Sequence, residues 1–250
     1  MKTVILGSGN VAYHLANAFA KNGTPIAQIF GRNAEALSEI SALLNIPYSV
    51  DNLEDADFYL ICVSDSSIEE VSSQIKKENC LVAHTSGSVS RDTLVGNYRK
   101  SVFYPLQTFS KFSEINYSEM PIFVDAENEE DKSFIFNLAK KISEKVHFAD
   151  DLKRRNIHLT AVFACNFVNH LYARAKEISD SQDLPFSYFL PLIDETCRKI
   201  HFMAPKMAQT GPAVRKDEKV LQKHEALLKD PQLLTIYKTL NESIKKMYEL

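Results

Sequence analysis

Hydrophobic and polar positions follow two different patterns along the chain. Up to residue 150, short apolar runs alternate with segments whose apolar residues recur at helical spacing. Strands are predicted at 3–6, 25–30, 46–50, 57–63, 80–84, 102–104, 121–125 and 145–148. The helices between them begin at Val11 and cover 34–44, 68–75 and 130–142. This alternation predicts an α/β fold with a doubly wound parallel sheet.

From residue 151 onward the pattern is helix upon helix. Segment 157–178 is apolar nearly all round, which predicts a helix buried on most sides. Helices are also predicted over 185–202 and 217–228, and a last one begins at Asp230-Pro231. Because residues 151–250 cannot easily surround the apolar helix by themselves, we expect a homodimer formed through these helices. We therefore predict a sheet domain over 1–150 and an all-helical domain over 151–250 that serves substrate binding and dimerisation.

A glycine turn joins the first predicted strand to the first predicted helix, and it reads Gly7-Ser8-Gly9-Asn10-Val11-Ala12. A G-x-G-x-x-A sequence in this setting is the fingerprint of dinucleotide binding. Gly7 permits the turn, Gly9 lets the backbone approach a pyrophosphate, and the helix amino terminus offers free N–H groups. The sequence predicts that residues 7–11 bind a nucleotide. The alternative is an ordinary glycine-rich turn.

Arg32 and Asn33 stand at the end of the second predicted strand, where the cofactor is selected. An NAD site carries an acid in this region for the ribose 2′-hydroxyl. An arginine instead suits a 2′-phosphate, so the sequence favours NADP. The alternative is that Arg32 is a solvated loop charge.

Other polar residues follow the ends of later predicted strands. In a doubly wound sheet, ligands bind beyond the carboxyl ends of the strands. We expect the cofactor cleft to be lined by Val63, Ser64, Asp65, Thr85 and Ser86. Some of these side chains are equally suited to cap helices. Gln107 and Thr108 are predicted to bind polar groups of the substrate, although they are equally suited to cap a turn.

Composition points to small-molecule chemistry. The chain is 45% hydrophobic and carries a formal charge of −3, with no basic field for nucleic acid and no polybasic cluster for a membrane. Its 4 cysteines lie singly, so neither a disulfide framework nor a metal site is expected. The first strand begins at the third residue and leaves no room for a signal peptide. These features favour a cytoplasmic protein.

Taken together, these pieces resemble the Rossmann-like proteins proposed as NADP oxidoreductases, which carry a helical carboxyl-terminal domain of unknown function. The resemblance covers nearly the whole chain. It rests on residues 7–12, 31–33, 84–88 and 104–109, on His158 with Asn166, and on residues 211–217. More distantly, the layout is similar to β-hydroxyacid dehydrogenases, ketopantoate reductases and pyrroline-carboxylate reductases, which implies an NADP domain before an all-helical dimerisation domain.

The resemblance also shows a departure. In the first two of these distant groups, a catalytic lysine precedes an asparagine by one helical turn. Matching Asn166 to that asparagine places Val162 where the lysine would stand. The usual proton donor is therefore absent, and those reactions cannot simply be carried over.

His158 and Asn166 share one face of the apolar helix. Burying such polar groups unpaired costs about 1–3 kcal/mol each, so they either face a cleft or pair within the core. Arg215 suits a substrate carboxylate or phosphate, or else pairs with Asp217 or a neighbouring subunit.

The sequence thus predicts an NADP(H)-dependent oxidoreductase that transfers a hydride to a small carbonyl or imine. His158 would donate the proton and Asn166 would orient the substrate. The alternative is a catalytically silent NADP(H)-binding sensor, which the missing lysine favours.

Overall fold

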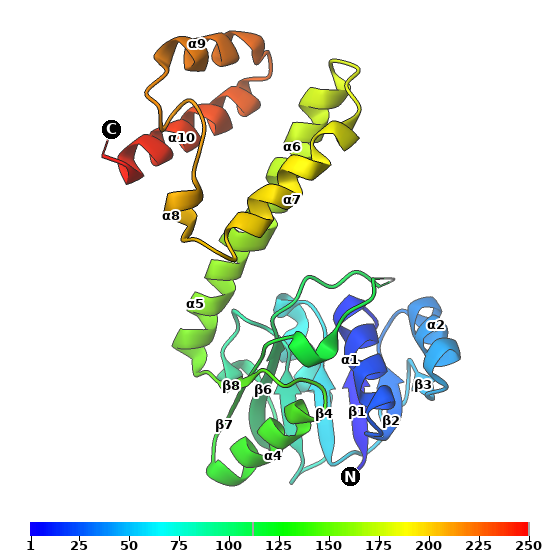
Figure 1. Cartoon of the computed structure of the whole chain (residues 1–250). Helices are drawn as coiled ribbons and strands as arrows, with labels where there is room; N and C mark the ends of the chain where they lie inside the picture. Colours follow the sequence, from blue (N-terminus) through cyan, green and yellow to red (C-terminus); the bar gives the residue numbers. More distant parts are fainter. Residues whose placement is uncertain (112, 250) are drawn as a thin grey trace. The chain divides into compact units, whose positions relative to one another are not determined.

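The computed structural model describes residues 1–111 and 113–249, and its contacts form two compact units, Met1–Asn166 and Phe167–Leu250. The first unit contains an eight-stranded sheet of order β3-β2-β1-β4-β5-β6-β7-β8 (Figure 1). The strands are β1 Thr3–Leu6, β2 Ile26–Phe30, β3 Tyr48–Ser49, β4 Phe58–Ile61, β5 Leu81–His84, β6 Arg99–Pro105, β7 Ile122–Ala126 and β8 Val146–Phe148.

The helical elements of the first unit cover the sheet and lead out of it. They are α1 Asn10–Lys21, α2 Ala34–Leu44, η1 Asp65–Ser67, α3 Ile68–Ser72, η2 Arg91–Thr93, η3 Tyr117–Glu119, α4 Glu129–Lys140, α5 Asp151–Ala161 and the π-helical turn η4 Val162–Asn166. The predicted α/β class is confirmed, and the order from β3 to β6 is that of a Rossmann fold.

The sheet is parallel except at one pair. β6 and β7 run antiparallel, with Ser101 opposite Ala126 and Pro105 opposite Ile122. The sequence predicted a parallel sheet throughout. The difference arises because the described residues of the loop that joins β6 and β7 contain only the short η3, and not the crossover helix that a parallel pair needs.

Two apolar layers form the core, one on each face of the sheet. Alternate side chains of a strand point to opposite faces, so Ile5 packs with α1, α2 and α4, whereas Val4 and Leu6 pack with α3. Figure 1 shows α1 and α4 in front of the strands. The central strands are buried on both faces, which explains why they are continuous apolar runs in the sequence.

Helices make up the second unit: α6 Phe167–Asp180, η5 Phe186–Tyr188, α7 Leu190–Lys199, α8 Pro205–Ala208, α9 Glu218–Leu227 and α10 Pro231–Met247. Arg174 of α6 pairs with Asp230, the cap of α10, at 2.6 Å. Large apolar side chains are exposed here, including Phe202 at 75% and Met207 at 78%. Among the described residues of this unit, the buried apolar ones are Ala213 and Leu221, so its core is thin.

The predicted straight helix over 157–178 is wrong in its middle. The π-helical turn η4 separates α5 from α6, and a π turn inserts extra backbone into a helix. Apolar spacing cannot reveal this, because the same side chains read as one continuous apolar segment. The predicted helix over 185–202 is likewise divided into η5 and α7, and α8 was not predicted.

The predicted domain boundary at residue 150 matches the change in secondary structure, since β8 ends at Phe148 and α5 begins at Asp151. Contacts nevertheless group α5 and η4 with the sheet. The division into a cofactor-binding domain over 1–150 and a helical domain over 151–250 therefore remains a prediction about function.

Gly7 lies in a crowded turn at the end of β1. Its φ is +129°, and a Cβ built on it would lie 2.3 Å from the carbonyl oxygen of Cys62. We expect Gly7→Ala to lower the free energy of unfolding by about 1–3 kcal/mol or more, measured by urea unfolding. Gly9→Ala is the matched control, because a Cβ on Gly9 meets nothing within 4 Å, and it should cost less than about 1 kcal/mol. Equal losses in the two variants would contradict this account.

Candidate functional site

The amino terminus of α1 is built to receive an anion. Its cap residue, Gly9, has no side chain to satisfy the first N–H groups, and no acidic residue lies in the first turn. These N–H groups carry the positive end of the helix dipole. A bound phosphate would therefore take the place that a capping side chain fills in other helices.

A hollow lies beside this turn, lined by the glycine turn and by the ends of β2 and β4. Arg32 lines it, is exposed, and forms no ion pair among the described residues. Asn33 also lines it, but its side chain accepts a hydrogen bond from the Ala36 N–H at 3.0 Å and so caps α2. The hollow thus has one free guanidinium and room for the nucleotide end of a cofactor.

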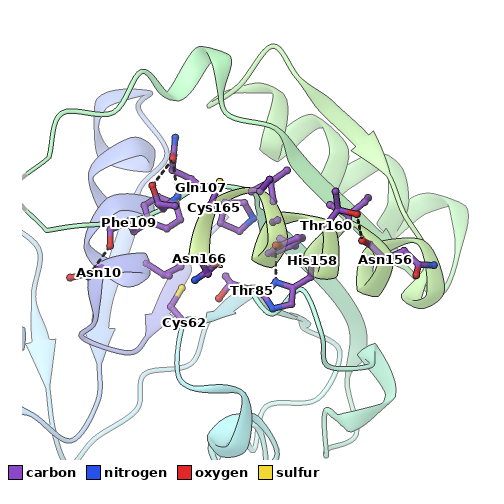
Figure 2. A pocket seen from close by; sticks show the side chains of 18 of the residues that line it. Asn10, Cys62, Thr85, Gln107, Phe109, Asn156, His158, Thr160, Cys165 and Asn166 are labelled. Atoms are coloured by element: carbon purple, nitrogen blue, oxygen red, sulfur yellow. Dashed lines mark hydrogen bonds between the residues drawn. The ribbon is translucent and has the colours of Figure 1, made fainter. Parts of the chain in front are cut away.

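The main pocket of the first unit has a volume of 1420 Å³ and adjoins the other side of the same turn. Its walls are the ends of β4, β5 and β6, the loop after β6, and the helical segment from α5 to η4. Figure 2 shows its labelled side chains, among them Asn10, Thr85, Gln107, His158 and Asn166.

The loop after β6 is tied to α1. Asn10 donates a hydrogen bond to the carbonyl of Phe109 at 3.0 Å. The buried His14 contacts the carbonyl of Ser110 at 2.8 Å and the hydroxyl of Tyr117 at 2.9 Å. These bonds fix the wall that carries Gln107 and Thr108 relative to the glycine turn.

Tyr104 and His158 meet inside this pocket. The Tyr104 hydroxyl lies 3.1 Å from Nδ1 of His158, and the two rings pack edge to face. Gly87 passes directly beneath them, and a Cβ there would lie 2.6 Å from Cζ of Tyr104 and 2.9 Å from Nδ1 of His158. A glycine at the end of β5 is therefore what allows a strand residue and a helix residue to form this pair.

A buried cation lies close to the pair. Arg154 of α5 is fully buried, and its Nη2 donates to the Val89 carbonyl at 2.6 Å and to the Asp151 carboxylate at 2.7 Å. Its Nε and Nη1 have no partner among the described residues. Burial, followed by the charge of Arg154, lowers the pKa of the nearby His84 to about 4, so His84 is neutral near pH 7.

Two family models match the chain. One, described as NADP oxidoreductase, coenzyme F420-dependent, matches residues 2–87. The other, a domain of unknown function (DUF2520), matches residues 120–244, which is half of the 250 residues. A crystal structure of a proposed NADP oxidoreductase from Bacteroides fragilis has a TM-score of 0.92 and 39% identity, covering 100% of this chain and 98% of that one. The chain belongs to this family of proposed NADP oxidoreductases.

Other similar structures share the fold at low identity. A reductive aminase from Aspergillus terreus, in complex with NADPH and ethyl-5-oxohexanoate, has a TM-score of 0.70 and 12% identity, covering 98% of this chain and 94% of that one. A pyrroline-5-carboxylate reductase from Coxiella burnetii has a TM-score of 0.58 and 15% identity, covering 99% and 97%. No curated protein matches the chain significantly. The family resemblance seen in the sequence is confirmed, as is the distant one to pyrroline-carboxylate reductases.

Most of the residues predicted to form the site line one of the two hollows. Gly7, Ser8, Arg32 and Asn33 line the smaller one. Gly9, Val63 and Ser64 line both. The main pocket adds Asn10, Val11, Thr85, Gln107, Thr108, His158 and Asn166.

Three predicted residues lie elsewhere. Asp65 accepts a hydrogen bond from the Ser88 hydroxyl, and the Ser86 hydroxyl accepts from the N–H groups of Ser88 and Val89, so both hold the turn after β5. Neither lines the two hollows. Arg215 is exposed in the second unit and forms no ion pair among the described residues.

Tyr104, Gly87 and Arg154 were not identified as site residues from the sequence. Tyr104 and His158 are 54 residues apart, on a strand and a helix, and no spacing rule connects them. The signals in the sequence were Gly87 within a serine-rich turn at a strand end and Tyr104 at the start of the segment 104–109 that carries the family resemblance. Within the described residues, no helix is long and apolar enough to cross a membrane. The same residues contain no group of three or more His, Cys, Asp or Glu able to hold a metal ion.

Proposed function

We propose that this protein is an NADP(H)-dependent oxidoreductase that transfers a hydride to a small carbonyl or imine. The observation that carries the proposal is that one pocket is lined by the open amino terminus of α1 and by the Tyr104–His158 pair. The first suits a cofactor phosphate, and the second suits proton transfer at the reacting atom.

The residues of the turn fit an NADP cofactor. Residues 7–11 would hold the pyrophosphate, Arg32 the 2′-phosphate, and Val63, Ser64 and Thr85 the remainder along the strand ends. When bound, NADPH supplies the hydride. One acidic residue, Glu70 of α3, also lines the smaller hollow. Arg32 is the cation in this lining.

The remaining residues would act on the substrate. Reduction of a carbonyl or imine leaves an anionic oxygen or nitrogen, and His158 would protonate it, since histidine is the side chain that most often acts as a general acid. Asn166 would orient the reacting atom, and Gln107 and Thr108 would bind polar groups of the substrate. Arg215 remains the candidate for holding a distal anionic group.

The choice of cofactor can be tested at Arg32. We expect NADPH to bind more tightly than NADH, and Arg32→Ala to weaken NADPH binding about ten- to hundredfold, because a charge-assisted hydrogen bond contributes about 1.5–3 kcal/mol. Titration of NADPH fluorescence measures this. Arg155→Ala is the control, since Arg155 is an exposed arginine outside both hollows. Equal affinities of the wild type for NADPH and NADH would remove the assignment.

The chemistry can be tested at His158. Screening carbonyl compounds, alone and with amines, for oxidation of NADPH would identify a substrate. His158→Gln should then lower turnover about 10²–10⁴-fold while NADPH affinity is retained. The exposed His147, outside the pocket, provides the control variant His147→Gln. NADPH binding without oxidation of any compound would favour the sensor, whose motivating observation is Val162 in place of the lysine.

The exposed apolar side chains of the helices indicate that the chain assembles into an oligomer. Leu159 is 56% exposed, and Leu192 of α7 is 65% exposed. Apolar surface of this extent is typical of an interface, so we propose a two-fold homodimer through the helices. Light scattering should give twice the chain mass of 28.3 kDa at micromolar concentration. A monomer under those conditions would contradict the proposal, as would a dimer that persists unchanged in Leu192→Asp combined with Leu159→Asp.

The four cysteines are free thiols: Cys62 and Cys80 are buried, whereas Cys165 and Cys197 are exposed. Exposed free thiols persist in a reducing compartment. A cytoplasmic location therefore remains our proposal.

A further inference from the structure

The Tyr104–His158 pair contains two side chains that can each carry a transferable proton, although the reduction needs only one proton donor. We infer that Tyr104 supplies, through His158, the proton that completes reduction of the substrate. This rests on the proposed reductase function. Tyr104 acts through His158 and is in this sense a positioning residue, since it sets which ring nitrogen of His158 carries hydrogen.

The direction of the hydrogen bond follows from satisfying the phenol. Tyr104 is 8% exposed, and Nδ1 of His158 is the one partner of its hydroxyl among the described residues. If Nδ1–H donated to the phenolic oxygen, the phenol O–H would lack an acceptor within the protein, and a buried unpaired donor is costly. In the proposed relay, the Tyr104 O–H donates to Nδ1.

This direction fixes the tautomer of His158. With Nδ1 accepting, the ring hydrogen of the neutral imidazole is on Nε2. Nε2 makes no hydrogen bond to any of the described residues, and His158 lines the pocket and is only half-buried. A substrate atom in the pocket can accept this hydrogen.

The transfer forms three new bonds to hydrogen, and each is matched by one that breaks. The hydride adds to the carbonyl or imine carbon, and the C=O or C=N π pair moves onto the oxygen or nitrogen. That atom takes the proton from Nε2, whose bonding pair stays on the ring, while Nδ1 takes the phenol proton of Tyr104. The site is reset when the phenolate of Tyr104 takes its proton back from Nδ1 and a water molecule supplies a new proton to Nε2, which restores the starting tautomer.

Arg154 partly offsets the effect of burial on a phenolate at Tyr104. Its buried guanidinium lies close enough to lower the pKa of Tyr104, although burial of the phenol is the larger effect and the net pKa of Tyr104 is raised. Asp65, on η1, is the other charge acting on the phenol and opposes Arg154. The Asp151 carboxylate pairs with Nη2 of Arg154 at 2.7 Å, whereas Nε and Nη1 have no partner among the described residues.

The relay and a direct imidazolium donor predict different pH dependences. An imidazolium donor is lost as the pH rises above about 6.5. The relay needs a neutral imidazole and a protonated phenol, and it therefore persists until the phenol ionises, whose pKa is raised above the ordinary value near 10.

The first test needs no substrate. In protein labelled with ¹⁵N at histidine, the two ring nitrogens of His158 report the tautomer directly, and His158→Gln assigns the signals. We expect the Nε2–H tautomer at pH 8.5, and a mixture of tautomers in Tyr104→Phe. The control is Tyr237→Phe, which removes a Tyr–His bond of 2.9 Å to His224 in the second unit and should leave the His158 signals unchanged. An Nδ1–H tautomer in the wild type would overturn the relay.

The second test is the pH profile of turnover with a substrate found by the NADPH screen. The wild type should keep its turnover up to about pH 9, whereas Tyr104→Phe should lose about tenfold per pH unit above about pH 7. A parallel profile in the two proteins would also overturn the relay. Thermal unfolding of Tyr104→Phe distinguishes a loss of folding from a loss of proton supply. If no compound is reduced, the proposed function fails, while the tautomer result still decides whether Tyr104 donates to His158.

Discussion

Crowding of the backbone at the end of β1 is the constraint on which the site depends. Gly7 approaches the carbonyl of Cys62 on the neighbouring strand so closely that no side chain fits, and its N–H donates to Phe30 on the other neighbour at 2.7 Å. The chain is therefore held against both β2 and β4 at the point where the strand order reverses. From there it turns at once into α1, whose uncapped amino terminus is left at the edge of the pocket.

A second close approach, at Gly87, positions the reacting groups, just as the close approach at Gly7 positions the nucleotide-binding turn. Gly87, in the turn after β5, approaches Tyr104 and His158 with space for a hydrogen atom but not for a methyl group. Tyr104 comes from β6 and His158 from α5, so the pair joins the sheet to the helix that leaves it. Both halves of the proposed chemistry are thus set by backbone contacts in the first unit, which are stiffer than contacts between long side chains.

The sequence predicted well those features that local patterns determine. Apolar runs placed all eight strands, and the glycine turn was recognised because its strand–turn–helix context lies within 20 residues. Prediction from the sequence failed for the features that depend on contacts between distant segments. The antiparallel β6–β7 pair depends on the course of a loop, the Tyr104–His158 pair on two elements 54 residues apart, and the burial of Arg154 on acceptors contributed by Val89 and Asp151. None of these leaves a periodic pattern.

The π-helical turn bears on the interpretation of Val162, which stands at the position where the distantly similar enzymes carry a catalytic lysine. A lysine one turn before an asparagine reaches the same substrate only if the helix between them is regular. Here Val162 begins the π turn and does not line the pocket, whereas Ala161 and Cys165 do, together with Asn166. Val162 is therefore not one of the side chains that line the pocket beside Asn166. Among the titratable side chains that line this pocket, His158 is the one that is paired with a phenol, one turn before Val162.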